Sequence, residues 1–301
     1  MINSEVNKLV IEKANSSRRI IHIITAFLKF DAFKRVNDVI NVDKVVEKHL
    51  LVRGRKEDFA NKSLDLIAIE YAFANGWAVY FNQSLHAKLY CFDDETAIIG
   101  SANLTNLAFD ECQRGNLELV TSIHLEYHDI QKIKNILNNS HRISDGDLKE
   151  IRLFCEEMGS YKIEEINRYK QWNFEKESSV DFLFPEDLID CSNFANLSET
   201  TCSIIGIDGN CFASAENLIE QFQTTNEYKW LVGLLNKENN RELSFGKISY
   251  EMHNSIVTNK RVFRKDIKNY VSILFDWIEF LNIVNVEIVK ADYTKLVKLR
   301  E

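Results

Sequence analysis

The chain has 301 residues, of which 45% are hydrophobic and 27% are charged, as is typical of globular proteins. No apolar run approaches the roughly 20 residues of a membrane helix, and residues 1–19 are too polar for a signal peptide. We therefore expect a cytoplasmic protein without a membrane partner. The net charge of −8 argues against binding nucleic acid over a wide surface, yet residues 241–301 carry 11 basic and 8 acidic residues. Only this end of the chain favours anionic partners.

The cysteines give no sign of a metal or disulfide framework. The chain has six cysteines, and none form a C-x-x-C pair. Without an export signal we expect reduced thiols. A zinc site made by Cys191, Cys202 and Cys211 is disfavoured, because their spacing does not fit a zinc knuckle and no histidine lies nearby. We predict no metal and no cofactor.

Strand and helix patterns mix over the first 160 residues. Apolar, β-branched runs predict strands at 19–27, 48–53, 77–81, 85–92, 97–99 and 116–123. Helical spacing predicts helices at about 31–40, 63–75, 127–137 and 145–158. The mixture predicts an α/β fold, with a mixed β-sheet sandwiched by helices, in a domain at 1–160.

The pattern changes near residue 159. A polar, charged stretch indicates a linker at 161–180, followed by a smaller, mainly helical domain at 181–301. Helices are expected there at about 228–235, 244–254 and 264–283, then two strands within 286–299, with Ser244 as the N-cap of the middle helix. Three helices followed by a hairpin is the order of a winged helix, and many small domains share it.

One segment contains a spaced set of reactive side chains. Residues 86–103 read HAKLYCFDDETAIIGSAN, which combines H-x-K, Asp93 and G-S-x-N. His86 and Lys88 are two residues apart in a predicted strand, so both side chains leave the same face. Together with Asn103 they offer a nucleophile, a positive charge and a neutral donor, a combination that suits a phosphodiester.

The residues around this set are predicted to support it. The alternate positions Leu85, Ala87 and Leu89 should face the core. A buried strand at 97–99 delivers Gly100 and Ser101 at its end. We expect Gly100 to let the backbone approach a ligand closely.

The full motif resembles that of the phospholipase D superfamily, often called the HKD motif. The resemblance implies a phosphodiesterase in which His86 attacks phosphorus to form a phosphohistidine that water then hydrolyses. Lys88 and Asn103 would hold the phosphate oxygens, and Glu118, in a downstream N-x-E, would hydrogen-bond the imidazole and fix its tautomer. Asp93, Ser101 and Gly100 would be supporting residues. No metal is needed, because lysines neutralise the charge.

The family mechanism uses two such motifs, and this chain has one. The second histidine should therefore come from another copy, in a homodimer. Members of this kind resemble small bacterial endonucleases, or metal-independent restriction enzymes with a DNA-recognition domain after the catalytic one. We expect a DNA endonuclease of a restriction or defence type. The alternatives are a phospholipase or phosphatidyl transferase, and a non-catalytic DNA-binding protein that retains the fold.

A basic cluster precedes and begins the last predicted helix. It consists of Lys260, Arg261, Arg264, Lys265 and Lys268. Such a cluster is usually a solvated helix start. Cations at a helix N-terminus oppose the helix dipole, however, so local physics does not favour them there. We therefore expect these residues to contact the phosphates of nucleic acid, most simply double-stranded DNA.

Overall fold

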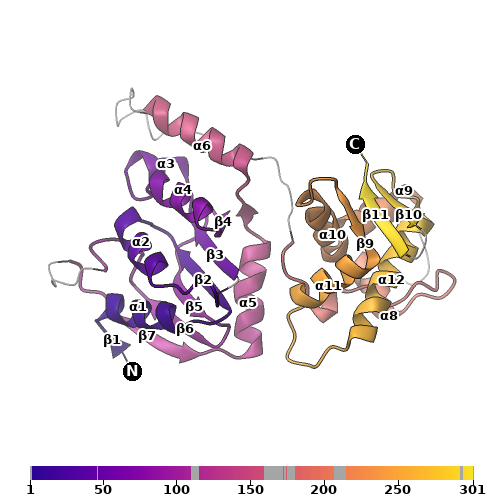
Figure 1. Ribbon diagram of the computed structural model, residues 1–301, viewed down its shortest axis with the longest axis horizontal. Helices are drawn as coiled ribbons and strands as arrows, with labels where there is room; N and C mark the ends of the chain where they lie inside the picture. The colour runs from indigo at the N-terminus through magenta and orange to yellow at the C-terminus, as the bar shows by residue number, and fades with distance from the viewer. Residues whose placement is uncertain are drawn as a thin grey trace. The chain divides into compact units, whose positions relative to one another are not determined.

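A computed structural model gives the structure and describes residues 2–45, 47–109, 115–158, 172, 174, 180–206, 215–291 and 294–300. The chain divides into two compact units (Figure 1). The first unit comprises Met1–Ile130 and Ser140–Lys176, and the second comprises Gln131–Asn139 and Glu177–Glu301. Most of the predicted linker at 161–180 lies outside the described residues, and the predicted boundaries of the two domains stay a prediction.

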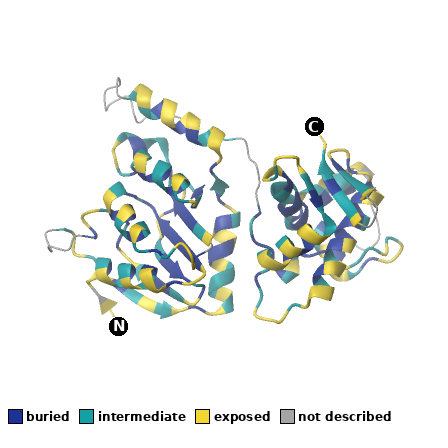
Figure 2. Cartoon of the chain, viewed as in Figure 1, coloured by how far each residue is buried: buried dark blue, intermediate teal, exposed yellow. Residues whose placement is uncertain are grey.

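The first unit is built on an eight-stranded sheet of order β1-β7-β6-β5-β2-β3-β4-β8. Its strands are β1 (Ile2–Asn3), β2 (Ile20–Thr25), β3 (Glu47–Val52), β4 (Ala78–Phe81), β5 (Lys88–Phe92), β6 (Thr96–Gly100), β7 (Val120–His124) and β8 (His141–Arg142). Strands β2, β3 and β4 are parallel, and the others pair antiparallel with their neighbours. Every residue of β2 is buried, as Figure 2 shows for the centre of the sheet. The mixed sheet of the predicted α/β fold is confirmed.

Helices pack against this sheet. They are α1 (Val6–Ser16), α2 (Phe30–Asp38), α3 (Lys56–Ala60), α4 (Leu66–Ala74) and α6 (Asp145–Met158). Helix α5 (Tyr127–Asn138) begins in the first unit and continues into the second, to which Gln131–Asn139 belong. One core joins the buried faces of α1, α2, α4 and α6 to alternate residues of the strands, such as Ile21 and Ile23 of β2. The indole of Trp172 belongs to this core and donates to the Gly54 carbonyl at 2.7 Å.

Helix α1 was not predicted from the sequence. Its stretch is polar and charged overall, so composition did not indicate it. Only Val6, Val10 and Ala14 are buried, and their four-residue spacing makes one narrow apolar stripe that packs on the core.

The second unit is largely helical and contains a small sheet. Its elements are the 3₁₀ turn η1 (Pro185–Asp187), α8 (Glu199–Ile205), α9 (Ala215–Thr224), α10 (Asn226–Asn236), β9 (Glu242–Ser244), α11 (Phe245–Ser255), α12 (Arg264–Leu281), β10 (Val286–Ala291) and β11 (Thr294–Leu299). Its separate core is centred on α12, where Val271, Leu274 and Trp277 are fully buried.

From α10 to β11 the second unit has the order of a winged helix. Strands β10 and β11 form a hairpin, and β9 pairs with β11, so the sheet order is β10-β11-β9. Ser244 caps α11 by accepting a hydrogen bond from the Lys247 amide at 3.3 Å. The predicted helical domain with a terminal hairpin is therefore present, with the short strand β9 added. None of the helices in the described ranges is both long and apolar enough to span a bilayer.

Candidate active site

The motif residues gather at one edge of the sheet, which we call the motif edge. The parallel strands β2, β3 and β4 end there, as does β6, and β5 and β7 begin there. Lys88 is therefore paired with Thr25, the last residue of β2, and Gly100 is paired with Val120. Residues separated by up to about 95 positions in the sequence meet at this edge because of the strand order.

His86 and Lys88 lie beside each other at the start of β5. Lys88 Nζ is 3.5 Å from His86 Nε2 and donates to the His86 carbonyl at 2.6 Å. His86 is exposed and precedes the strand, because pairing with β2 begins only at Lys88. The predicted strand at 85–92 is therefore shorter, and the prediction that Ala87 faces the core is wrong, since Ala87 is exposed. Leu85 is buried and anchors the segment.

The environment of Lys88 lowers its pKa from the ordinary value of 10.5. Partial burial is the main cause, because it disfavours the charged ammonium. Arg53 lowers the pKa further by repulsion, whereas the negative charge of Glu118 raises it. Both charges therefore act at the motif edge together with Lys88.

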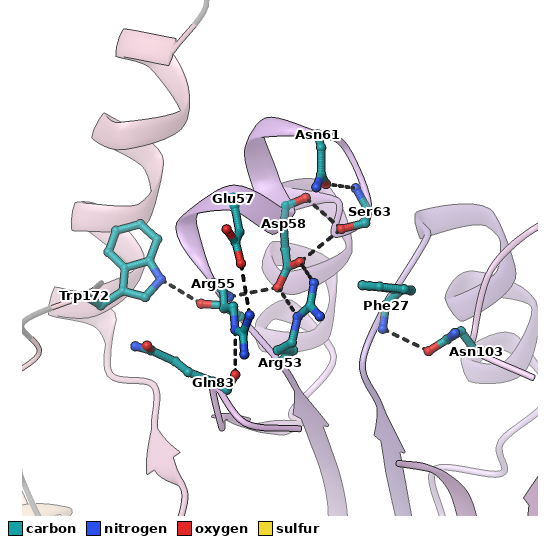
Figure 3. A network of polar contacts seen from close by, with 11 residues as sticks. Phe27, Arg53, Arg55, Glu57, Asp58, Asn61, Ser63, Gln83, Asn103 and Trp172 are labelled. Atoms are coloured by element: carbon teal, nitrogen blue, oxygen red, sulfur yellow. Dashed lines mark hydrogen bonds and ion pairs between the residues drawn. The ribbon is translucent and has the colours of Figure 1, made fainter. Parts of the chain in front are cut away.

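Asn103 is fixed in orientation by the end of β2. Its Oδ1 accepts a hydrogen bond from the Phe27 amide at 3.2 Å (Figure 3). It also accepts from the Thr25 hydroxyl at 3.3 Å. The Thr25 hydroxyl also accepts from the Leu104 amide at 3.1 Å. Because the amide oxygen is used in this way, the amide nitrogen is the group that can donate to a ligand.

Glu118 lies against Ser101. The Ser101 hydroxyl donates to Glu118 Oε2 and accepts from the Leu119 amide at 3.1 Å, and Asn116 Nδ2 donates to Glu118 Oε1 at 3.4 Å. Over the described part of the chain, no hydrogen bond joins Glu118 to His86. The predicted contact between this carboxylate and the imidazole stays a prediction.

Gly100 lies in close contact with the neighbouring strand β7. A Cβ added there would lie 2.1 Å from the Leu119 carbonyl oxygen and 2.8 Å from the Val120 Cα. The glycine is therefore needed by the neighbouring strand β7, because backbone atoms cannot move aside as a flexible side chain can. The expectation that Gly100 lets the backbone approach a ligand stays a prediction.

Asp93 lies at the other end of β5 from Lys88. Its carboxylate accepts the backbone amides of Arg18, Arg19 and Ile20 at 2.8–3.1 Å. It therefore organises the start of β2 and is about 16 Å along the strand from Lys88, at about 3.3 Å per residue.

Arg53 is a residue of the motif edge that the sequence reasoning missed. It follows β3, and its guanidinium lies 4.8 Å from the centre of the Phe27 ring. Its Nε donates to Asp58 Oδ2 at 2.9 Å, and Asp58 also accepts from the Ser63 hydroxyl at 3.2 Å (Figure 3). The signal in the sequence was an arginine at the end of a predicted strand, directly before Gly54.

The basic cluster belongs to the second unit. Its five members are exposed, and among the described residues none of them forms an ion pair. Asp266 accepts from the Phe263 amide at 3.1 Å and so caps the start of α12. The one acidic residue within the cluster is therefore engaged with the backbone rather than with the cations.

Comparison with known proteins agrees with this geometry. A family model described as cardiolipin synthase, PLD-like domain, matches residues 10–140. No curated protein sequence matches the chain significantly.

Solved structures similar to the chain include Nuc, a phospholipase D family member from Salmonella typhimurium. It has 16% identity and a TM-score of 0.37, over 48% of this chain and 99% of Nuc. NucT from Helicobacter pylori has 18% identity and a TM-score of 0.30, and the match covers 45% of this chain and 89% of NucT. The archaeal chromatin protein TrmBL2 has 13% identity and a TM-score of 0.33, and the match covers 48% of this chain and 54% of TrmBL2. The matched residues 10–140 contain the whole motif, and the N-terminal half of this chain therefore contains a PLD-like domain.

Proposed function

We propose that the chain is a metal-independent phosphodiesterase that cleaves DNA, with His86 as its nucleophile. The observation that carries this proposal is the pair formed by exposed His86 and half-buried Lys88, 3.5 Å apart at the motif edge, where Thr25 and Phe27 fix the amide of Asn103. An imidazole, an ammonium and an amide donor at one place can attack a phosphodiester and stabilise the charge that develops on it.

In the proposed reaction a nitrogen of His86 attacks phosphorus, and the bond to the leaving oxygen breaks. That oxygen takes a proton from the imidazole of a second copy. Water then attacks phosphorus, the P–N bond breaks, and the water gives a proton back to the second imidazole. Lys88 and the Asn103 amide hold the non-bridging oxygens, while Glu118 moderates the local positive charge.

A homodimer supplies the second histidine in this scheme. Leu107, Leu117 and Leu119 support it, because they are 60%, 87% and 51% exposed and flank Glu118. The Leu119 carbonyl accepts from the Ser101 amide and the Leu119 amide donates to the Ser101 hydroxyl, both at 3.1 Å, and the Leu107 carbonyl accepts from the Asn116 amide at 2.9 Å. A second copy that covered these leucines would bring two motif edges together about a twofold axis.

DNA is favoured over lipid by the second unit. The basic cluster lies at the start of α12, the third helix of the winged-helix order, and the N-terminal residues of the equivalent helix in helix-turn-helix proteins contact DNA. Five exposed cations that lack acidic partners within the described residues fit phosphate contacts. A phospholipase or phosphatidyl transferase is the competing function.

Cleavage assays test the proposal. Plasmid and single-stranded DNA are incubated with the protein in EDTA and in Mg²⁺, beside His86→Ala and a control variant, His124→Ala, which changes an exposed histidine of β7. We expect cleavage in EDTA that persists in the control and is lost in His86→Ala. Cleavage that requires Mg²⁺ and survives His86→Ala would contradict the proposal. Hydrolysis of phospholipid vesicles without cleavage of DNA would favour the lipid function.

A further inference from the structure

A row of potential metal ligands crosses the sheet away from the motif edge. On β2, Ile21 and Ile23 face the main core, so His22 points to the opposite face. The strand register places His49 of β3 beside His22 on one side and Cys91 of β5 on the other. The rings of His22 and His49 stack with their centres 4.9 Å apart.

The turn after β5 brings a carboxylate to this row. Asp93 and Asp94 both have positive φ angles, 58° and 57°, which non-glycine residues adopt only when their surroundings hold them there. The three backbone amides that Asp93 accepts account for its own conformation. The same tight turn places Asp94 Oδ1 at 3.0 Å from His22 Nε2.

The resulting cluster combines three kinds of ligand atom in a closed space. One ligand atom each from His22, Cys91 and Asp94 lies within 4.8 Å of the others. These residues are 0%, 0% and 7% exposed. A buried carboxylate is costly to desolvate unless a positive charge or a hydrogen-bond donor faces it, and His22 and Arg19 face Asp94 here.

We propose that His22, Cys91 and Asp94 bind a structural divalent metal ion of the zinc type. Imidazole nitrogen, thiolate sulfur and carboxylate oxygen are the ligands that zinc uses in proteins. A neutral imidazole, a thiolate and a carboxylate would together balance the charge of a divalent ion, and the thiol proton would leave to solvent on binding. His49 is not part of this group of ligand atoms; it stacks on the His22 ring and so helps to hold that imidazole in place.

Arg19 extends from solvent to the carboxylate of this cluster. Its Nη2 lies 3.4 Å from Asp94 Oδ2, and its side chain is 59% exposed. Arg19 also lines a surface cavity of about 440 Å³ together with Phe92 and Asp93. An ion that binds Asp94 Oδ2 would displace the exposed side chain of Arg19 from this carboxylate.

The proposed ion would clamp the turn between β5 and β6 to strand β2. Cys91 is three residues from Lys88, about 10 Å along β5 at about 3.3 Å per residue. The ion would therefore stabilise the strand that carries Lys88 without touching a phosphate at the motif edge. The proposal is independent of the proposed function, because it concerns binding and stability rather than cleavage.

Metal content and spectroscopy test the proposal directly. The purified chain is incubated with Zn²⁺, passed over a desalting column and analysed for zinc and protein, and a second sample is loaded with Co²⁺. We expect about one zinc per chain and a thiolate-to-cobalt charge-transfer band in the near ultraviolet. Protein that retains no zinc, or a cobalt sample without a thiolate band, would overturn the proposal even if no variant could be made.

Variants localise the ion. Cys91→Ala and Asp94→Asn should each lower the retained zinc at least about tenfold, whereas Cys155→Ala, which changes a half-buried thiol of α6, should retain it. Circular dichroism checks that each variant folds. Chelation should lower the melting temperature of the wild type but not of folded Cys91→Ala. Equal zinc retention in wild type and folded Cys91→Ala would place the ion elsewhere and contradict the proposal.

Discussion

The two units of the chain differ in how their polar and charged side chains are arranged. In the first unit, His86, Lys88 and Asn103 meet at one edge of a sheet, where strands from distant parts of the sequence hold them. In the second unit, the basic cluster lies along a single stretch of chain at the start of α12 and is exposed throughout. The first arrangement is suited to chemistry at one phosphorus atom, and the second to attraction of a polyanion.

Because of this difference, cleavage and binding should respond to different substitutions. Removal of a group at the motif edge should abolish turnover and leave binding largely intact. Removal of cations from the basic cluster should weaken binding and its salt dependence. Substitutions made in one unit at a time can separate cleavage from DNA binding.

Lys88→Ala should abolish cleavage, with a loss on the order of 10³-fold or more, because one stabilising charge is removed from the transition state. Single-turnover rates on plasmid DNA measure the effect. Lys149→Ala, an exposed lysine of α6, is the control and should cleave normally. DNA affinity should change little in either variant. A Lys88→Ala protein that cleaves within about threefold of wild type would remove Lys88 from the mechanism.

Glu227→Gln should make the stability of the second unit less dependent on pH. Burial raises the pKa of the Glu227 carboxyl from 4.5 to about 8, and the nearby Asp187 adds to this shift. The folded state thus keeps a proton that the unfolded chain loses above pH 4.5. The free energy of unfolding should therefore fall as pH rises from 4.5 to about 8, by at most about 1.4 kcal/mol per pH unit.

Hydrogen exchange of α10 at about pH 5.5 and about pH 8.5, corrected for intrinsic rates, measures this change in the second unit. Wild type should lose protection at the higher pH, and Glu227→Gln should not. Glu220→Gln changes an exposed carboxyl of α9 and should behave as wild type. Equal loss of protection in Glu227→Gln and wild type would show that another group controls the pH response.

Gly100→Ala should destabilise the first unit by about 3 kcal/mol, because the added methyl group meets the backbone of Leu119 and Val120. Chemical denaturation measures this effect. Gly146→Ala is a matched control, since its Cβ would meet nothing closer than 3.5 Å and lies within α6. That control should be neutral or up to about 1 kcal/mol more stable. Equal stability of the two variants would contradict the close contact between β6 and β7.

Arg261→Ala combined with Arg264→Ala should weaken DNA binding by about tenfold and should reduce the salt slope by about one for each phosphate that the variant no longer neutralises. Titrations at several salt concentrations measure both quantities. Arg300→Ala is the control, because Arg300 already pairs with Glu287 at 3.1 Å. Unchanged affinity and slope in the double variant would remove the basic cluster from the DNA-binding surface.

Much of the fold could be predicted because its signals are local. β-branched runs indicated β2 and β3, and helical spacing indicated α4 and α12. Helix α1 was not predicted, because its apolar stripe consists of three residues only. Helix α8 was not predicted either, although Ser198 caps it by accepting a hydrogen bond from the Thr201 amide at 3.0 Å.

The candidate site was predictable only where its residues are close in sequence. The spacing of His86, Lys88 and Asn103 could be recognised directly. The role of Arg53 could not be recognised from the sequence, because its place near Lys88 depends on the order of strands in the sheet. Likewise, His22 and Asp94 are 72 residues apart and come together only through the pairing of β2 with β5.

Trapping the covalent intermediate would examine the role of His86 without relying on loss of activity. The protein is mixed with a DNA duplex, quenched in base within the first turnover, digested and analysed by mass spectrometry, since phosphohistidine survives base. We expect a nucleotide adduct on the peptide that contains His86. Cleavage that proceeds at full rate with no adduct on that peptide, and that persists in His86→Ala, would contradict the assignment of His86 as the nucleophile.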